Sequence, residues 1–142
     1  MKHHPVLHVV AKMIMPFIML FALYVQFHGD YGPGGGFQAG VIFGAGFVLY
    51  GIIFGIRTTL IVAPETVVRM IAALGVLLYT GVGVASMLLG GEFLNYSVLL
   101  SDTVAGQHLG ILLIELGVGL TVASIMITLF YCFSTHRLSD SD

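Results

Sequence analysis

The segment from Gln107 to Phe133 reads QHLGILLIELGVGLTVASIMITLFYCF, and Glu115 is its only acidic, lysine or arginine residue. A helix needs about 20 apolar residues to cross roughly 30 Å of hydrocarbon, because each residue advances it by about 1.5 Å. This run is long enough and apolar enough to do so. We therefore predict a transmembrane helix over about residues 107–133.

Three other stretches of the chain share this length and polarity, at about residues 6–27, 37–56 and 67–90. The chain has 142 residues, of which 58% are hydrophobic and only 8% are charged, and its mean hydropathy is +1.04. Soluble domains have a smaller apolar share and a larger charged share. The sequence predicts an all-α integral membrane protein, a single membrane domain over residues 1–142 with four transmembrane helices.

The basic residues predict the orientation of these helices. All 5 lysines and arginines fall on one side of the predicted topology, whereas the opposite loops carry acidic residues and no lysine or arginine. The positive-inside rule then places both termini in the cytoplasm. The basic side holds Lys2, Lys12, Arg57, Arg69 and Arg137, and the opposite side holds Asp30, Glu92 and Asp102.

Several function classes lack the residues that they require. Cys132 is the only cysteine, so a disulfide framework and a CxxC site are excluded. The histidines show no HExxH spacing, and no nucleophile, base and orienting group stand in a recognisable pattern. The net charge is -2 and there is no basic run, so the chain has no positive surface that would attract nucleic acid. We therefore predict no enzyme, no metal, no cofactor and no nucleic-acid partner.

Small residues form stripes on two of the predicted helices. Four glycines of the second span fall within about 60° of one helix face, and five small residues of the fourth span lie within about 40–60° of each other. Such stripes let two backbones approach closely in lipid, so we interpret them as helix-packing surfaces. The first contains Gly40, Gly44, Gly51 and Gly55, and the second contains Gly110, Gly117, Thr121, Ser124 and Thr128.

Glu115 should point about 140° away from the stripe of its own helix. A carboxylate about a third of the way into the membrane costs several kcal/mol when it faces lipid, so it should face protein or water. The fourth span would then need protein on two sides, which indicates that the chain is one subunit of a larger assembly. Glu115 is either a protonated structural group or an ion-pathway carboxylate. Both roles require a partner, such as Lys12, His108 or a neighbouring subunit.

Lys12 and Pro16 mark a second place of interest, in the first predicted span. Lys12 lies about 9 Å beyond the start of that span, close enough to the cytoplasmic face for its side chain to snorkel. Pro16 has no N–H for the carbonyl of residue 12 and should kink the helix there. A cation beside a freed carbonyl could instead line a hydrated route. The ion-pathway candidates are therefore Glu115, Lys12, Pro16 and His108.

The connection between the first two spans carries the most specific motif. Residues 28–36, HGDYGPGGG, predict a tight, irregular external loop because glycine permits positive φ and proline fixes φ. The longer run GDYGPGGGFQAG, residues 29–40, resembles the signature loop of the MrpB/MnhB family, small proteins of Mrp-type, or Mnh-type, cation/proton antiporters. The four spans and Pro16 are also similar to that family. The matching positions are Pro33, Gly34, Gly35, Gly36, Phe37, Gln38 and Gly40, whereas Ala39 replaces a frequent glycine.

The resemblance implies a small membrane subunit of a bacterial hetero-oligomeric Na+/H+ antiporter in the cell membrane. Such a complex exchanges cytoplasmic sodium for external protons, uses the proton motive force, and supports pH and salt homeostasis. Its other subunits, including large proton-translocating ones, would be the partners, and the matching loop would shape a subunit junction. Three roles stay open for this chain: lining part of the ion route, acting purely as a scaffold, or serving as the equivalent module of a membrane-bound hydrogenase or respiratory complex.

Overall fold

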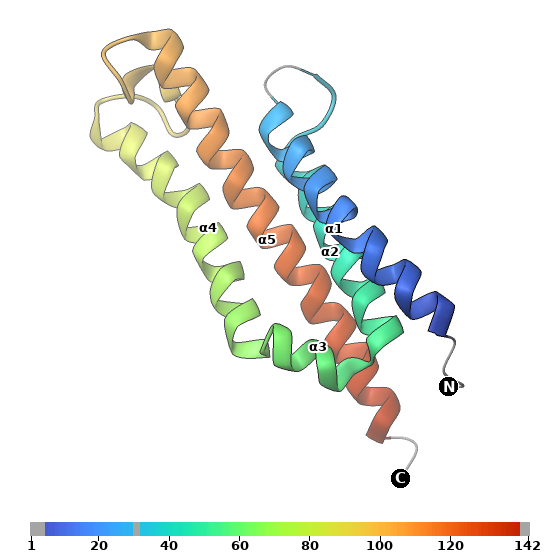
Figure 1. Ribbon diagram of the computed structural model, residues 1–142. Coiled ribbons are helices and arrows are strands. Elements are labelled where there is room, and N and C mark those ends of the chain that lie inside the picture. Colours follow the sequence, from blue (N-terminus) through green and yellow to red (C-terminus); the bar gives the residue numbers. More distant parts are fainter. Residues whose placement is uncertain (1–4, 30–31, 140–142) are drawn as a thin grey trace.

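The structure, a computed structural model, describes residues 5–29 and 32–139, with side chains up to residue 134. Within these ranges all regular structure is helical (Figure 1). The helices are α1 (Pro5–His28), α2 (Gly36–Phe54), α3 (Ile56–Val62), α4 (Glu65–Leu88), the short 3-10 helix η1 (Tyr96–Val98) and α5 (Thr103–Ser139). α1, α2, α4 and α5 are each long and apolar enough to cross a membrane. The predicted all-α fold with four transmembrane helices is confirmed.

The observed helix ends differ from the predicted ones in two places. α2 ends at Phe54 because Gly55 has φ 89° and ψ 153°, a conformation that glycine adopts easily and that interrupts the helix. The chain then forms α3, where the sequence predicted only a loop. α5 begins at Thr103, earlier than the predicted start at 107, and continues to Ser139.

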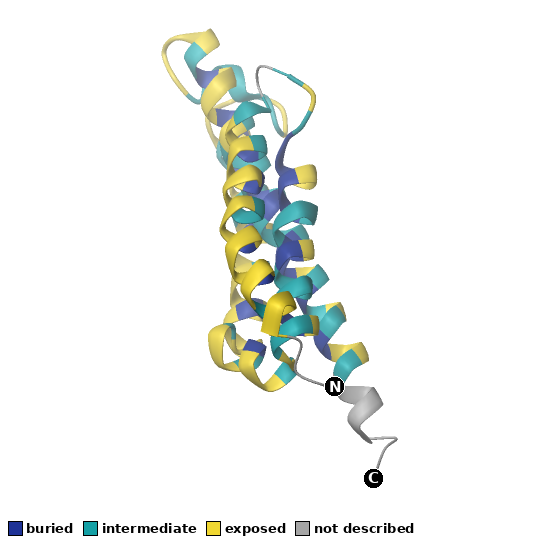
Figure 2. Ribbon diagram, turned by 45° about the vertical axis from the view of Figure 1, so that its right-hand side comes forward, coloured by how far each residue is buried: buried dark blue, intermediate teal, exposed yellow. Residues whose placement is uncertain are grey.

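α5 is the central helix of the bundle. α4 packs along one side of it and α2 along another, while α1 packs mainly on α2 (Figure 1). The buried residues accordingly face the interior of the bundle, and the exposed ones lie on its outward sides (Figure 2). On α1 and α4 many of the exposed residues are large and apolar. Those outer sides are suited to lipid or to other membrane helices.

The connection between α2 and α4 is held to α5 by one buried tyrosine. The Tyr131 side chain is 2% exposed, and its hydroxyl donates a hydrogen bond of 2.8 Å to the carbonyl oxygen of Ala63 at the end of α3. The ring packs with Val68 and Ile127 in a small apolar core. This contact fixes where α3 ends and α4 begins.

Replacing Tyr131 with Phe should therefore destabilise the chain by about 1 kcal/mol, because the Ala63 carbonyl loses its buried donor. Thermal unfolding of the detergent-solubilised protein measures the effect. Tyr24→Phe is the matched control, since Tyr24 is 58% exposed and its hydroxyl should matter little. Equal melting temperatures for the two variants would show that the hydrogen bond contributes nothing.

η1 covers the N-terminal part of α5 from the α4 side. Asn95 caps it by accepting a hydrogen bond of 3.2 Å from the backbone N–H of Ser97. The Tyr96 side chain lies directly over Gly110, where a Cβ would overlap its ring. Burial, followed by the nearby Tyr79 phenol, raises the pKa of Tyr96 above its ordinary value. Gly110 therefore contacts this loop helix, and the prediction that it packs against another membrane helix is wrong.

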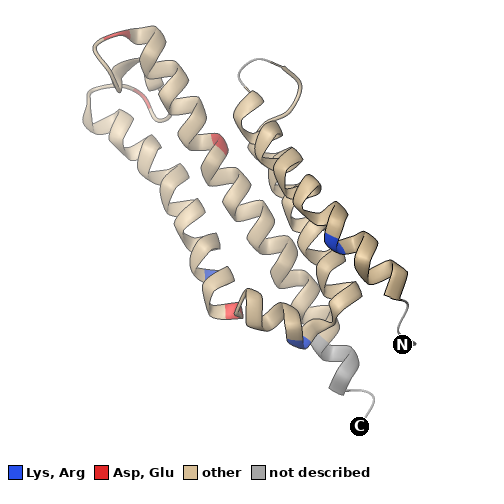
Figure 3. Ribbon diagram, viewed as in Figure 1, with Lys and Arg blue, Asp and Glu red and all other residues tan. Residues whose placement is uncertain are grey.

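The described basic side chains lie toward the end of the bundle that holds both termini (Figure 3). They are Lys12, Arg57 and Arg69, and the loops at the other end carry Glu92 and Asp102. Lys2, Asp30 and the Arg137 side chain lie outside the described residues. Placement of both termini in the cytoplasm is consistent with this distribution and stays a prediction.

Candidate functional site

The side chain of Glu115 lies against the backbone of the loop that joins α1 to α2. A Cβ built on Gly29 would overlap the carboxylate, and one built on Gly35 would lie 2.7 Å from Oε1. A Cβ on Gly36 would overlap the backbone carbonyl oxygen of Glu115. Real Cβ atoms essentially never come closer than 3.0 Å to such neighbours, so larger residues would force the loop and α5 apart. The glycine-rich motif and Glu115 thus meet, a contact that the sequence did not predict.

Two loop glycines also have backbones that other residues rarely adopt. The φ angles of Gly34 and Gly35 are 144° and 149°. These values lie in a region where a side chain would strain the backbone. Gly35 is also the N-cap of α2, and its carbonyl accepts the hydrogen bond from the Ala39 N–H at 3.0 Å. The loop can therefore pack closely against α5 and lead directly into the first turn of α2.

This arrangement places a carboxylate at the N-terminus of a helix. Gly35 and Gly36, which contact Glu115, are the N-cap and first residue of α2. The first N–H groups of a helix have no intrahelical partner, and the helix dipole puts partial positive charge there. Both effects favour a negative charge at this position. The fold thus places the Glu115 side chain beside the N-terminal, positive end of the α2 dipole.

Glu115 lies well inside the length of α5. It follows Thr103 by twelve residues, which is about 18 Å along a helix. Since the loop meets α5 at Glu115, α1 and α2 end short of the N-terminal end of α5, as Figure 1 shows. The loop therefore packs against the side of α5 and not beyond its end.

Gln26 is a polar residue of this region that the sequence reasoning missed. Its side chain is 6% exposed, and its Oε1 lies against Gly119, one turn after Glu115 on α5. Among the described residues its Nε2 finds no hydrogen-bond acceptor. The cost of a polar group within an apolar span, which singled out Glu115, applies to Gln26 as well. That signal was available in the sequence.

A groove lies below the loop, between α4 on one side and α1 and α2 on the other, with α5 as its floor. Its volume is about 410 Å³, and its lining is mostly apolar. Gln26 and Ser124 contribute polar side chains to that lining. Glu115 is not part of the lining of this groove.

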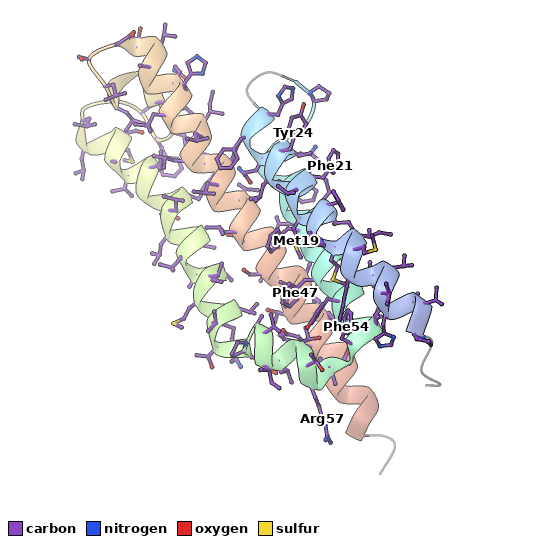
Figure 4. All side chains as sticks on the ribbon, viewed as in Figure 1. Met19, Phe21, Tyr24, Phe47, Phe54 and Arg57 are labelled. Carbon is purple, nitrogen blue, oxygen red and sulfur yellow. The ribbon has the colours of Figure 1, made fainter. Side chains whose placement is uncertain are left out.

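Lys12 does not approach Glu115. It precedes Gly29 by seventeen residues, about 25 Å along α1, so the expectation that Lys12 could pair with Glu115 is wrong. Its Nζ instead lies 5.8 Å from the ring centroid of Phe54, a cation–π contact at the end of α2, where Figure 4 labels Phe54. Pro16 lies on an exposed part of α1, near Lys12 and far from the loop.

His108 lies on the same face of α5 as Glu115 but not beside it. The two residues are seven positions apart, which is about two helical turns and about 10 Å. The side chain of His108 is exposed. Of the ion-pathway candidates, Glu115 and His108 therefore share one face of α5. Lys12 and Pro16 lie on α1, in the half of that helix that is remote from the glycine-rich loop.

The glycines of α2 lie along its contact with α5. A Cβ on Gly40 would be 2.7 Å from the carbonyl oxygen of Gly119, and one on Gly44 would be 3.0 Å from the Cβ of Met126. Gly51 lies against the ring of Phe130. Gly55, in contrast, is outside α2 and has no atoms near its Cβ position, so its assignment to the stripe is wrong.

The stripe of α5 faces α4. A Cβ on Gly117 would be 2.9 Å from the carbonyl oxygen of Gly75, and Thr121 lies against Gly75 as well. α5 thus has protein on both sides, with α4 against the stripe and the glycine-rich loop against Glu115. Because this chain supplies both, the two covered faces of α5 do not by themselves require further subunits.

The fold and this site define a class: small multi-span membrane proteins in which an acidic side chain is held within the membrane domain by an irregular loop. Residues 6–128 match the family described as "Domain related to MnhB subunit of Na+/H+ antiporter". The chain belongs to the MnhB family. Relatives named "Putative antiporter subunit mnhB2" from Staphylococcus aureus strains Newman and COL are 31% identical to it over 135 residues, covering 93% of this chain and 95% of theirs.

Proposed function

We propose that this chain is a small membrane subunit of a bacterial multisubunit Na+/H+ antiporter. In this proposal it is required for sodium efflux driven by the proton motive force, and hence for pH and salt homeostasis. It resides in the cytoplasmic membrane with both termini inside, and its partners are the other subunits of the complex. Family membership supports the antiporter assignment. The chain acts as a transporter component, not as an enzyme.

The observation that carries a direct role in transport is the enclosure of the Glu115 carboxylate by Gly29, Gly35 and Gly36. A carboxylate inside a membrane domain is costly, and ionisable residues there usually mark an ion pathway or a proton relay. Carboxylate and carbonyl oxygens are hard ligands of the kind that sodium prefers, and a carboxylate also carries protons. We infer that Glu115 lies on, or next to, the ion route of the complex.

Two other functions make different demands. A pure scaffold would need the same glycines but would not need the charge of Glu115. A module of a hydrogenase or respiratory complex would associate with iron–sulfur subunits. Purification of the assembled complex through a tag on this chain separates the last function from the first two, because iron–sulfur proteins would be retained only by a redox complex.

The test of the proposed function compares membrane vesicles that contain the whole complex with vesicles in which only this chain is missing. We expect sodium-dependent proton exchange in the first and none in the second, with exchange restored when the chain is supplied from a plasmid. Exchange that continues at a normal rate without the chain would overturn the proposal.

A further inference from the structure

The groove over α5 has one polar end, and the rest of it is apolar. Gln26 lines the groove near the end of α1, together with Ala39 in the first turns of α2. Val62 and Ala63 of α3 line its other end. Between these two ends the lining is apolar except for Ser124. The groove therefore has the polarity of an amphiphilic ligand, which is polar at one end and apolar along its length.

Gln26 contributes a hydrogen-bond donor that the chain leaves unused. Its side chain is 6% exposed, and its Nε2 has no hydrogen-bond acceptor among the described residues. Its Oε1 lies against Gly119 on the floor of the groove, so the NH2 group is the end of the amide that lacks a partner. A buried donor without an acceptor is costly. A ligand that carries an acceptor at this end of the groove would remove that cost.

The position of Gln26 along α1 indicates which acceptor is available to it. α1 has 24 residues and is about 36 Å long, slightly more than the roughly 30 Å of the hydrocarbon core. Gln26 precedes His28, the last residue of α1, by two positions, or about 3 Å. Its amide therefore lies close to the boundary between hydrocarbon and headgroups. The ester carbonyls of phospholipids lie at that boundary, and they are acceptors only.

The size of the groove favours a lipid chain over a helix of another protein. Its lining on α5 runs from Leu116 to Ile127, which is about 16 Å along the helix. Its volume of about 410 Å³ lies within the range of small-molecule pockets, about 300–1,000 Å³. A helix about 10–12 Å wide would need about 1,200 Å³ or more over the same length. One extended acyl chain therefore fits where a helix does not.

We propose that this groove binds one phospholipid, with an acyl chain along the apolar lining and an ester carbonyl that accepts a hydrogen bond from the Nε2 of Gln26. The groove is half open, so the second chain and the headgroup remain in the bilayer. The bound chain fills the space between α4 and the pair formed by α1 and α2. This inference goes beyond the proposed function and does not depend on ion exchange.

Lipid titration of the purified full chain, followed by native mass spectrometry, tests the hydrogen bond. The chain is stripped of lipid by detergent exchange and then receives phosphatidylglycerol with either ester-linked or ether-linked chains, of which only the ester form has carbonyl acceptors. We expect the original chain to bind its first ester lipid about three- to tenfold more tightly than its first ether lipid, the effect of one hydrogen bond. Gln26→Leu should lower ester binding to the ether level.

Gln107→Leu is the matched control, because Gln107 is exposed on α5 and does not line the groove. This variant should distinguish the two lipids as the original chain does. Equal affinity of the original chain for both lipids would overturn the proposal. So would a folded Gln26→Leu chain that still prefers the ester lipid to the original extent. Circular dichroism and the melting temperature establish that each variant is folded.

A photoreactive lipid shows what occupies the groove in the assembled complex. A phospholipid with a diazirine midway along one ester-linked chain is incorporated and irradiated, and the labelled residues are mapped by peptide mass spectrometry. We expect label on Phe47 in the groove wall, and we expect Ala123→Phe, which fills the floor, to remove it. Ala73→Phe, at an exposed position of α4, should leave it unchanged. Label on exposed residues such as Phe17, without label on Phe47, would overturn the proposal, since a partner segment would then occupy the groove.

Discussion

Gly36→Ala is expected to prevent the chain from accumulating in the membrane. The new Cβ would overlap the backbone carbonyl oxygen of Glu115, so neither a rotamer change nor a small side-chain shift can make room. Overpacking of a well-packed site costs about 1–3 kcal/mol, and a clash between two backbones belongs at or above the upper end of that range. The measurements are the amount of chain in purified membranes and its melting temperature in detergent.

Gly81→Ala provides the matched control for this prediction. Gly81 is an exposed helical glycine of α4 with no atoms within 4 Å of its Cβ position. Alanine there should stabilise the helix by about 0.5–1 kcal/mol, because glycine loses more backbone entropy on folding. A Gly36→Ala chain that melts at the temperature of the Gly81→Ala chain would contradict the close contact between the loop and α5.

The membrane spans could be predicted from the sequence because lipid imposes length and polarity on every spanning helix. The interruption at Gly55 could not, because a glycine near the end of an apolar run is equally compatible with a longer helix. Whether Gly55 interrupts the helix depends on the position of α3, which contacts Tyr131 of α5. Such tertiary contacts leave no local pattern in the sequence.

The site was predicted in parts but not as a unit. Glu115 was identified by the cost of a charge in an apolar span, and Gly35 and Gly36 by resemblance to a family loop. Their contact joins positions some eighty residues apart, and no periodicity encodes it. The same reasoning placed Lys12 near Glu115, because a sequence shows that both are charged but not that about 25 Å of α1 separates them.

The contact also changes what the glycine motif explains. A loop that only shaped a junction between subunits would need glycine for its turn, as at Gly34 with φ 144°. Gly29 and Gly36 have no such φ requirement, and their small size is needed because Glu115 occupies the space of a side chain. The motif is therefore matched to an acid in the same chain, and the acid becomes the residue to test.

Glu115→Gln is expected to abolish sodium-dependent proton exchange while leaving assembly of the complex nearly normal. Glutamine keeps the size of the side chain, so the loop should still close over it. The loss of charge at the N-terminus of α2 should cost only about 0.3–2 kcal/mol of stability. A neutral amide, however, carries no exchangeable acid proton and lacks the charge that attracts a cation, so exchange should fall at least about tenfold if a barrier rises by about 1.4 kcal/mol or more.

Glu115→Asp and Glu92→Gln separate charge from shape in the same assay. Aspartate keeps the negative charge on a side chain that is shorter by one methylene group. The Glu115→Asp complex should therefore exchange sodium faster than the Glu115→Gln complex. Glu92 is an exposed loop residue, and its replacement by Gln should leave exchange unchanged. Exchange and assembled complex are quantified in the same vesicles. Normal exchange in Glu115→Gln would remove Glu115 from the ion route and leave a scaffold role, whereas equal loss of exchange and assembly would show that the carboxylate acts by holding the glycine-rich loop in place.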